Sequence, residues 1–157
     1  MSYPRHLLSR SFTHTTYTGG NYTLTSTSWA AIDNSNLPLS LYAQDSDVLE
    51  IGINGLWGSE NQTGSLDVVT YVDGIVNWVG GAEADSGNYG IVGWYGPPNV
   101  ISPVSGSMLY TVGPADIEDD GIVSLRLMYR VTGSRTFYAS TTHPLHWYAK
   151  NIGPAAT

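Results

Sequence analysis

Cysteine is absent from this chain of 157 residues. Disulfides, thiolate metal sites and a cysteine nucleophile are therefore excluded, and the fold must rest on packing and hydrogen bonds. A chain of this length suits one domain, which buries roughly 70% of the surface that the unfolded chain exposes. The sequence thus predicts a single domain that needs no covalent cross-link.

Charged side chains are also scarce. They make up 12% of the chain, and the net charge is −7, whereas an average domain has about a quarter of its residues charged. Because nucleic-acid binding requires basic patches, this balance argues against nucleic acid as a main partner. Tyrosine and tryptophan are plentiful, with 11 and 5 copies. Low charge with many amphipathic rings is typical of a subunit whose surface is partly covered by neighbours.

Long apolar runs are missing. The first ten residues hold only the apolar pair Leu7 and Leu8, far short of the apolar region of a signal peptide. No stretch approaches the roughly 20 apolar residues of a membrane helix. We therefore expect neither a secretion signal nor a membrane partner.

Helical periodicity is scarce too, and short alternating runs separated by Gly, Pro, Asn and Asp take its place. This pattern predicts an all-β fold, an antiparallel β-sandwich of jelly-roll type with about eight to ten strands. The clearest strand is Ile122–Val131, in which every second residue from Val123 onward is apolar. Further strands are expected at residues 22–25, 37–43, 48–53, 66–71, 75–79, 89–95, 108–112, 136–140 and 145–150.

The first twenty residues differ from the rest in charge. They contain Arg5 and Arg10 and no acid, so all 13 acidic residues lie beyond them. We therefore divide the chain into an extended N-terminal arm, residues 1–20, and one β-sandwich domain, residues 21–157. Residues 80–90 and 96–105 are rich in turn-forming residues and are expected to be surface loops, and residues 113–117 to form one helical turn.

Two acidic clusters have the oxygen-rich character of a cation site. They are Asp45, Asp47 and Glu50, and residues 118–120. Their spacing does not match a calcium loop, so we interpret both as turns exposed to solvent. A hydrolase that uses the first cluster is the least favoured alternative, because nothing in the sequence indicates a cleft.

The remaining residues give no sign of catalysis. His143 and His146 have an H-x-x-H spacing, but residues three apart on a strand point to opposite faces, so the pair is not expected to share a metal. No nucleophile elbow, phosphate loop or dinucleotide fingerprint occurs. We predict no catalytic residue, no metal site and no cofactor, and that the protein is not an enzyme.

Aromatic and basic residues supply two candidate contact sites. Trp57, Trp78 and Trp94 lie near expected loops and could stack on sugar rings, although a role in the core or a subunit interface is favoured for them. Arg126, Met128 and Arg130 share one face of the clearest strand and are candidate interface residues, with solvation at the surface as the alternative.

Several segments together resemble one protein family. They read WAAID at residues 29–33, LSLYA at 39–43, DVLEIGI at 47–53, DGIVSLRLMYR at 120–130 and LHWYAKNIG at 145–153. This combination resembles small β-sandwich virion proteins of tailed bacteriophages, a class of capsid decoration proteins, head fibres and tail-fibre tips. The resemblance covers residues 29–154 and implies jelly-roll subunits that form homotrimers.

The resemblance also implies a function and a location. It implies a non-enzymatic virion structural protein, and first of all a capsid decoration protein that binds the major capsid protein and stabilises the outer surface of the head. Such a protein is made in the host cytoplasm and ends on the capsid surface. The alternative is a receptor- or carbohydrate-binding tip of a tail fibre, which would use the three tryptophans.

We expect the basic arm to dock on the capsid. Its Tyr, Thr and Ser content suits a strand added to the edge of a neighbour's sheet, where main-chain hydrogen bonds give affinity. The candidate docking residues are Arg5, His6, Arg10, His14 and Tyr17.

Overall fold

The computed structural model describes residues 11–28, 30–59, 64–72, 77–79, 92–96, 100–131 and 134–154. At residues 59, 64–72, 77–79, 92–96, 100, 102, 104 and 130 only the course of the backbone is described. The strands are β1 (Phe12–Tyr17), β2 (Tyr22–Leu24), β3 (Ala30–Ala31), β4 (Leu39–Tyr42), β5 (Asp47–Ser59), β6 (Gly64–Val72), β7 (Asn77–Val79), β8 (Val92–Gly96), β9 (Val100–Thr111), β10 (Ile122–Val131), β11 (Arg135–Tyr138) and β12 (Leu145–Pro154), and η1 (Pro114–Asp116) is a 3₁₀ turn.

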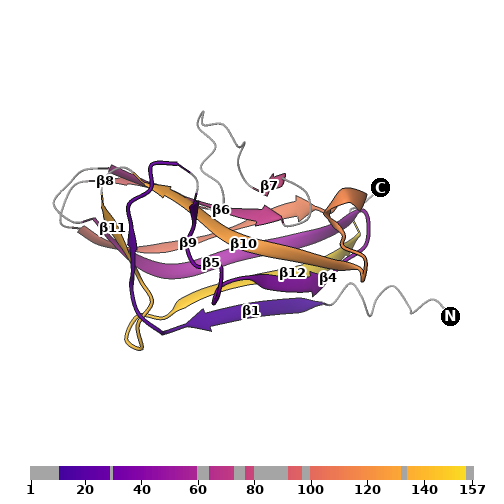
Figure 1. Ribbon diagram of the computed structural model, residues 1–157, viewed down its shortest axis with the longest axis horizontal. Coiled ribbons are helices and arrows are strands. Elements are labelled where there is room, and N and C mark those ends of the chain that lie inside the picture. The colour runs from indigo at the N-terminus through magenta and orange to yellow at the C-terminus, as the bar shows by residue number, and fades with distance from the viewer. Residues whose placement is uncertain are drawn as a thin grey trace.

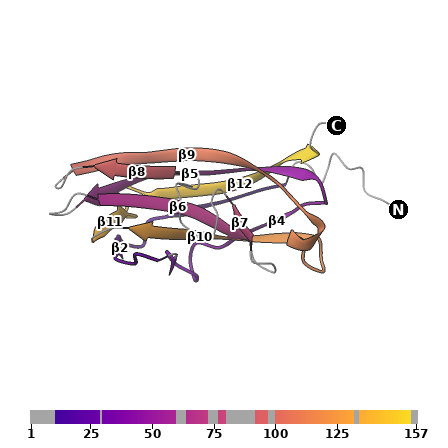
Figure 2. The ribbon, with the colours of Figure 1, turned by 90° about the horizontal axis from the view of Figure 1, so that it is seen from above.

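The strands form two six-stranded antiparallel sheets. In sheet A, β5 pairs with β9 along one edge and with β12 and then β11 along the other. β1 pairs with the outer edge of β12, and β2 pairs with the outer edge of β11. In sheet B, β10 pairs with β4 and β3 on one side and with β6 on the other, and β6 also pairs with β7 and β8. The sheets pack face to face, with β9, β5 and β12 in one layer and β10 and β4 in the other (Figures 1 and 2).

The core fills the space between the sheets. On β10 every second residue from Val123 to Val131 is buried, and on β12 every second residue from Leu145 is buried, as the period of two predicts. The largest core side chains are Trp57 and Trp147, and the Trp147 indole donates to the Leu37 carbonyl at 2.8 Å. Each fully buried large apolar side chain contributes roughly 1.5–3 kcal/mol to folding.

Several expectations from the sequence are confirmed. The all-β sandwich is observed, the strand Ile122–Val131 has the predicted bounds, and the predicted helical turn is η1. The expected loop at residues 96–105 is wrong, because β9 begins at Val100. Among the described strands, β9 pairs only with β5, and a strand at a sheet edge accommodates a proline such as Pro103.

The predicted boundary of the arm at residue 20 is also wrong. Phe12–Tyr17 forms a strand that pairs along its whole length with β12, so these residues belong to the sandwich. Thr13, Thr15 and Tyr17 alternate with more exposed residues, which is the pattern of an edge strand. β1 therefore extends the chain's own sheet, whereas the sequence led us to expect it on a neighbour's sheet.

Candidate functional site

The outward surface of sheet A is the most unusual surface in the described chain. Among the residues whose side chains the structure describes, five large hydrophobic side chains are exposed. Four of these lie on this surface: Phe12 on β1, Ile101 and Leu109 on β9, and Ile152 on β12. Each is at least 47% exposed. Apolar side chains that gather on one side of a sheet mark an interaction surface more often than scattered ones do.

Register defines the other members of this surface, which we call the sheet A face. Residues that pair across β1, β12, β5 and β9 point to the same side of the sheet. Ile152 lies at the bulge in β12 and belongs to this side by alternation along the strand. The face consists of Phe12, His14, Thr16, Val48, Glu50, Gly52, Asn54, Leu56, Gly58, Ile101, Pro103, Ser105, Ser107, Leu109, Thr111, His146, Tyr148, Lys150 and Ile152.

Permanent charge on the sheet A face is limited to one pair of residues. Glu50 of β5 lies opposite Lys150 of β12 in the register. The hydroxyl of Tyr148 donates to Oε1 of Glu50 at 2.7 Å, and this hydrogen bond raises the pKa of Tyr148. The carboxylate is thus bonded within the face, which lowers the cost of covering it with another protein.

An aromatic ring lies flat on this face because the residue beneath it is glycine. A Cβ atom placed on Gly52 would come within 2.5 Å of the Tyr148 ring. Phe12 lies beside the ring, with 6.2 Å between the ring centroids, and His14 lies beside Phe12 at 5.3 Å. This arrangement could not be predicted from the sequence, because only the strand register reveals that Gly52 and Tyr148 are neighbours.

Histidines of the described chain also gather near this face. His146 on β12 forms a hydrogen bond through Nδ1 with the Thr16 hydroxyl of β1 at 2.9 Å. His143 precedes β12 and contacts the Tyr138 ring edge-on at 6.0 Å. His143 therefore lies in the turn before the strand that carries His146, and the described residues contain no group that could hold a metal ion.

The predicted docking residues of the arm fall into two groups. Arg5, His6 and Arg10 lie outside the described residues. His14 is exposed on the sheet A face. Tyr17 is turned toward the core side, where its ring stacks on Tyr22 with centroids 5.3 Å apart.

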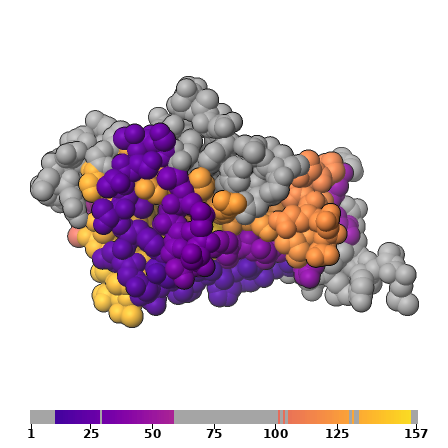
Figure 3. Space-filling model, viewed as in Figure 1, coloured from indigo at the N-terminus to yellow at the C-terminus, as the bar shows by residue number. Residues whose placement is uncertain are grey.

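The predicted interface residues of the clearest strand lie on the other sheet. Arg126 and Met128 point outward from β10 in sheet B and are half-buried. The backbone of Arg130 pairs with Asp67 of β6, and the side chain of Arg130 is outside the description. Figure 3 looks onto this side of the molecule, where segments that precede residue 59, in indigo and purple, occupy much of the surface.

One of the three tryptophans that were predicted as alternative sugar-stacking residues is buried. Trp57 is 0% exposed and packs in the core, so its ring is not available to a sugar. The role in the core that was favoured for it is confirmed. Trp78 and Trp94 lie on β7 and β8, where the side chains are outside the description.

The second acidic cluster is an exposed turn, as expected, whereas the first cluster is a turn only at Asp45, because Asp47 begins β5 and Glu50 lies within it. Asp45 is exposed, whereas Asp47 is 1% exposed and accepts hydrogen bonds from the Gln44 amide and the Asn151 side chain. The interpretation of Asp47 as a solvated residue is therefore wrong. A carboxylate of this kind stabilises the turn that leads into β5.

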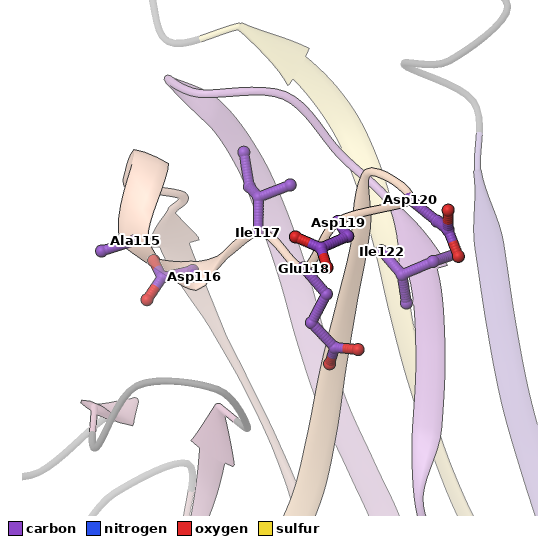
Figure 4. A pocket seen from close by; sticks show the side chains of 7 residues that line it. All are labelled: Ala115, Asp116, Ile117, Glu118, Asp119, Asp120 and Ile122. Atoms are coloured by element: carbon purple, nitrogen blue, oxygen red, sulfur yellow. The ribbon is translucent and has the colours of Figure 1, made fainter.

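The second acidic cluster lines a hollow of about 660 Å³ beside η1. Figure 4 shows the carboxylates of Asp116, Glu118, Asp119 and Asp120 spread along the turn, with no common point on which they converge. Asp116 is buried and accepts from the Tyr110 hydroxyl at 2.6 Å and the Gly113 amide at 2.9 Å. The hollow is therefore the outside of a hydrogen-bonded turn.

Within the described ranges no helix has the length and apolar character needed to cross a membrane.

Comparisons with known proteins bear on the fold alone. No family model matches the chain, and no curated protein matches its sequence. Among solved structures, the chain is similar to the Eiger TNF of S. frugiperda, with a TM-score of 0.50 and 10% identity over 94% of this chain and 97% of that one. A second likeness is to infectious bursal disease virus, Gx strain, with a TM-score of 0.35, 13% identity, and coverage of 92% of this chain and 38% of the viral one. The likeness to the TNF confirms that the chain is a β-sandwich of jelly-roll type.

Proposed function

We propose that this protein is a non-catalytic virion structural protein, a capsid decoration protein that forms homotrimers through the sheet A face and binds the outer surface of a bacteriophage head. The observation that carries the proposal is the concentration of four exposed hydrophobic side chains on one face of a jelly-roll subunit. The resemblance of residues 29–154 to phage virion proteins gives the proposed location.

Self-association suits the chemistry of the sheet A face. In a ring of three copies each interface is heterologous, so one part of the sheet A face meets a different part of the next copy. A face with one acid and one lysine generates little like-charge repulsion in such a contact. Covering Phe12, Ile101, Leu109 and Ile152 removes apolar surface from water at roughly 25 cal/mol per Å². A trimer would also cover the outer edge of β9, which pairs with no second described strand and is otherwise open to unwanted pairing.

Binding to the head is assigned to the N-terminal residues. Arg5, His6 and Arg10 give this segment its basic character. The segment joins the sandwich at Ser11, whose carbonyl accepts from the Asn151 amide at 2.8 Å. Three copies of such a segment on one trimer would multiply a weak contact with the shell, since linked sites act at a high effective concentration.

The test uses heads assembled without this protein, incubated with the purified full chain and recovered by sedimentation. Wild-type protein is expected to sediment with the heads and to add regular three-lobed density in electron micrographs. Loss of residues 1–10 is expected to abolish binding while the protein remains trimeric. Wild-type protein that stays in the supernatant at concentrations where it is trimeric would refute the role in decoration.

A further inference from the structure

Two histidines lie on the sheet A face, on the neighbouring strands β1 and β12. His14 pairs with Tyr148, and Thr16 pairs with His146, so the two histidines occupy diagonal positions in the register. Diagonal neighbours of this kind lie about 7–8 Å apart across a sheet. Both histidine side chains are exposed in the single chain. They therefore belong to one patch, which self-association through the face would cover.

The contacts of both imidazoles within the chain are compatible with a proton. His14 lies beside Phe12, with 5.3 Å between the ring centroids, and Phe12 is itself 55% exposed. His146 forms its hydrogen bond through Nδ1 with the Thr16 hydroxyl at 2.9 Å. A hydroxyl donates to a neutral imidazole nitrogen and accepts from a protonated one, so this bond exists in both charge states. Protonation therefore changes the charge of the face and keeps this bond.

The other ionisable groups on the face balance one another. On β5 and β12 they are Glu50 and Lys150, which lie opposite each other in the register, and Tyr148, whose hydroxyl donates to Glu50. The face residues of β9, and those of β1 other than His14, have no ionisable side chain. The face is therefore neutral while His14 and His146 are neutral, and it carries two positive charges when both are protonated.

Groups outside the patch do not supply a counter-charge to these histidines. His143 lies in the turn before β12, where it contacts the Tyr138 ring. Arg5, His6 and Arg10 lie outside the described residues, and all three are basic. Salt at 0.15 M screens exposed charges beyond about 8 Å, so the acidic excess of the rest of the chain has little influence on the patch. The charges on the face itself therefore decide the sign of any effect.

A protonated imidazole costs more to cover than a neutral one, because a charge removed from water requires a counter-charge. The sheet A face of another copy offers one carboxylate, that of Glu50, which already has Lys150 opposite it and the Tyr148 hydroxyl bonded to it. This carboxylate cannot compensate two imidazolium groups. Histidine ordinarily takes up its proton as pH falls through about 6.5, so the extra cost arises just below neutral pH.

We propose that His14 and His146 make assembly through the sheet A face sensitive to pH. Copies of the chain associate while both imidazoles are neutral, and they separate as the imidazoles take up protons below about pH 6.5. This inference rests on the proposed self-association of the sheet A face. It adds a release step to that function, in which mild acid returns the assembled copies to folded single chains.

The experiment measures association of the full chain by sedimentation equilibrium at pH 7.5 and pH 5.5, at one ionic strength of 0.15 M. The quantity compared is the concentration at which half of the chains are trimeric. It rises about thirtyfold between the two pH values if one imidazole per copy must be neutral in the trimer, and about a thousandfold if both must be. Circular dichroism is expected to show that the separated chains remain folded at pH 5.5.

The double variant His14→Gln with His146→Gln replaces both imidazoles by neutral side chains that keep a hydrogen-bond donor and acceptor. Whatever its affinity at pH 7.5, its half-association concentration is expected to change less than about threefold between the two pH values, because no titrating group is left on the histidine patch. His143→Gln removes an exposed histidine outside the sheet A face. It is the matched control and should keep the full shift of the wild type.

The outcomes separate this inference from the proposed function. A wild type that is trimeric with the same half-association concentration at both pH values would overturn the pH dependence and leave self-association standing. A shift that persists in the double variant, or that disappears in His143→Gln, would also overturn it. A wild type of one chain's mass at both pH values and every concentration would refute self-association and this inference together. If the double variant does not associate, the single variants His14→Gln and His146→Gln take its place, and a full wild-type shift in both would overturn the inference.

Discussion

Asn151 of β12 donates from Nδ2 to Oδ2 of Asp47 at 2.8 Å, and both side chains are buried. The same Nδ2 atom donates to the Tyr42 carbonyl at 3.1 Å, and Oδ1 of Asn151 accepts from the Gly153 amide at 2.9 Å. This one amide therefore connects the turn before β5, the end of β4 and the bulge in β12. It is the polar centre of the end of the sandwich at which β1 begins.

Removal of this amide is expected to destabilise the fold. Asn151→Ala leaves the Asp47 carboxylate with one donor fewer in a buried position, so the free energy of unfolding should fall by about 2–4 kcal/mol. Urea unfolding measures this change. Asn34→Ala, at an exposed position outside the sheet A face, is the control and should change stability by less than about 0.5 kcal/mol. Equal losses in the two variants would contradict the assignment.

The lowered pKa of Asp33 predicts how the stability of the fold depends on pH. Hydrogen bonds from the Asn36 side chain, and then from Tyr22 and the backbone, hold the pKa of Asp33 at about 2, below its ordinary 3.8. A lowered pKa in the folded state adds stability above pH 4, and this contribution is lost as pH falls from about 4 to 2. Solvent screening limits the loss to about 1 kcal/mol.

Asp33→Asn is therefore expected to flatten the acid limb of the stability curve. Thermal unfolding measured between pH 2 and 5 tests this prediction. The exposed Asp45→Asn provides the comparison and should retain the decline of the wild type. The same decline in Asp33→Asn would show that another carboxylate is responsible.

Two truncations distinguish the contribution of the basic segment, residues 1–10, to stability from that of β1. Deletion of residues 1–10 is expected to leave the free energy of unfolding within about 0.5 kcal/mol of the wild type. Deletion of residues 1–17 removes β1 and its six paired residues, and should cost at least about 3 kcal/mol and expose the edge of β12 to aggregation. Equal stability of the two truncations would mean that β1 contributes nothing to the sandwich.

Gly52 tests the position of the aromatic ring on the sheet A face. In Gly52→Ala the new methyl group must displace the Tyr148 ring and its hydrogen bond to Glu50, at a cost of about 1–3 kcal/mol. The displaced ring changes the shape of the sheet A face and makes it less complementary to another copy, so we expect weaker self-association in sedimentation velocity. Gly121→Ala strains a turn with φ of +77° far from this face, and should lower stability with no change in association.

The sequence was sufficient to predict most of the sandwich, because strand alternation is a local signal. The inward residues of β10 and β12 are the apolar ones that the period of two selected. β9 was missed at its start because Pro103 normally interrupts a strand, and only its position at a sheet edge makes the proline acceptable. β1 was assigned to an arm because its threonines and basic neighbours suggested exposure.

The candidate site was harder to predict, because it depends on which strands become neighbours. Phe12, Leu109 and Ile152 are far apart in the sequence, and only the pairing of β1, β12, β5 and β9 brings them to one face. Burial of Trp57 and Arg135 is equally a result of packing. A tryptophan or an arginine in a strand has the same local pattern whether it faces the core or the solvent.

Sedimentation equilibrium of the wild type, Leu109→Asp and Tyr42→Asp tests whether the sheet A face joins copies of this chain. Leu109 is 62% exposed on the sheet A face, and Tyr42 is 52% exposed on sheet B, so the two variants add the same charge at similar exposure on opposite sides. We predict a mass three times the 16.9 kDa of the chain for the wild type and Tyr42→Asp, and the mass of one chain for Leu109→Asp. A wild type of one chain's mass at every concentration, or a trimer broken by Tyr42→Asp and not by Leu109→Asp, would contradict the account.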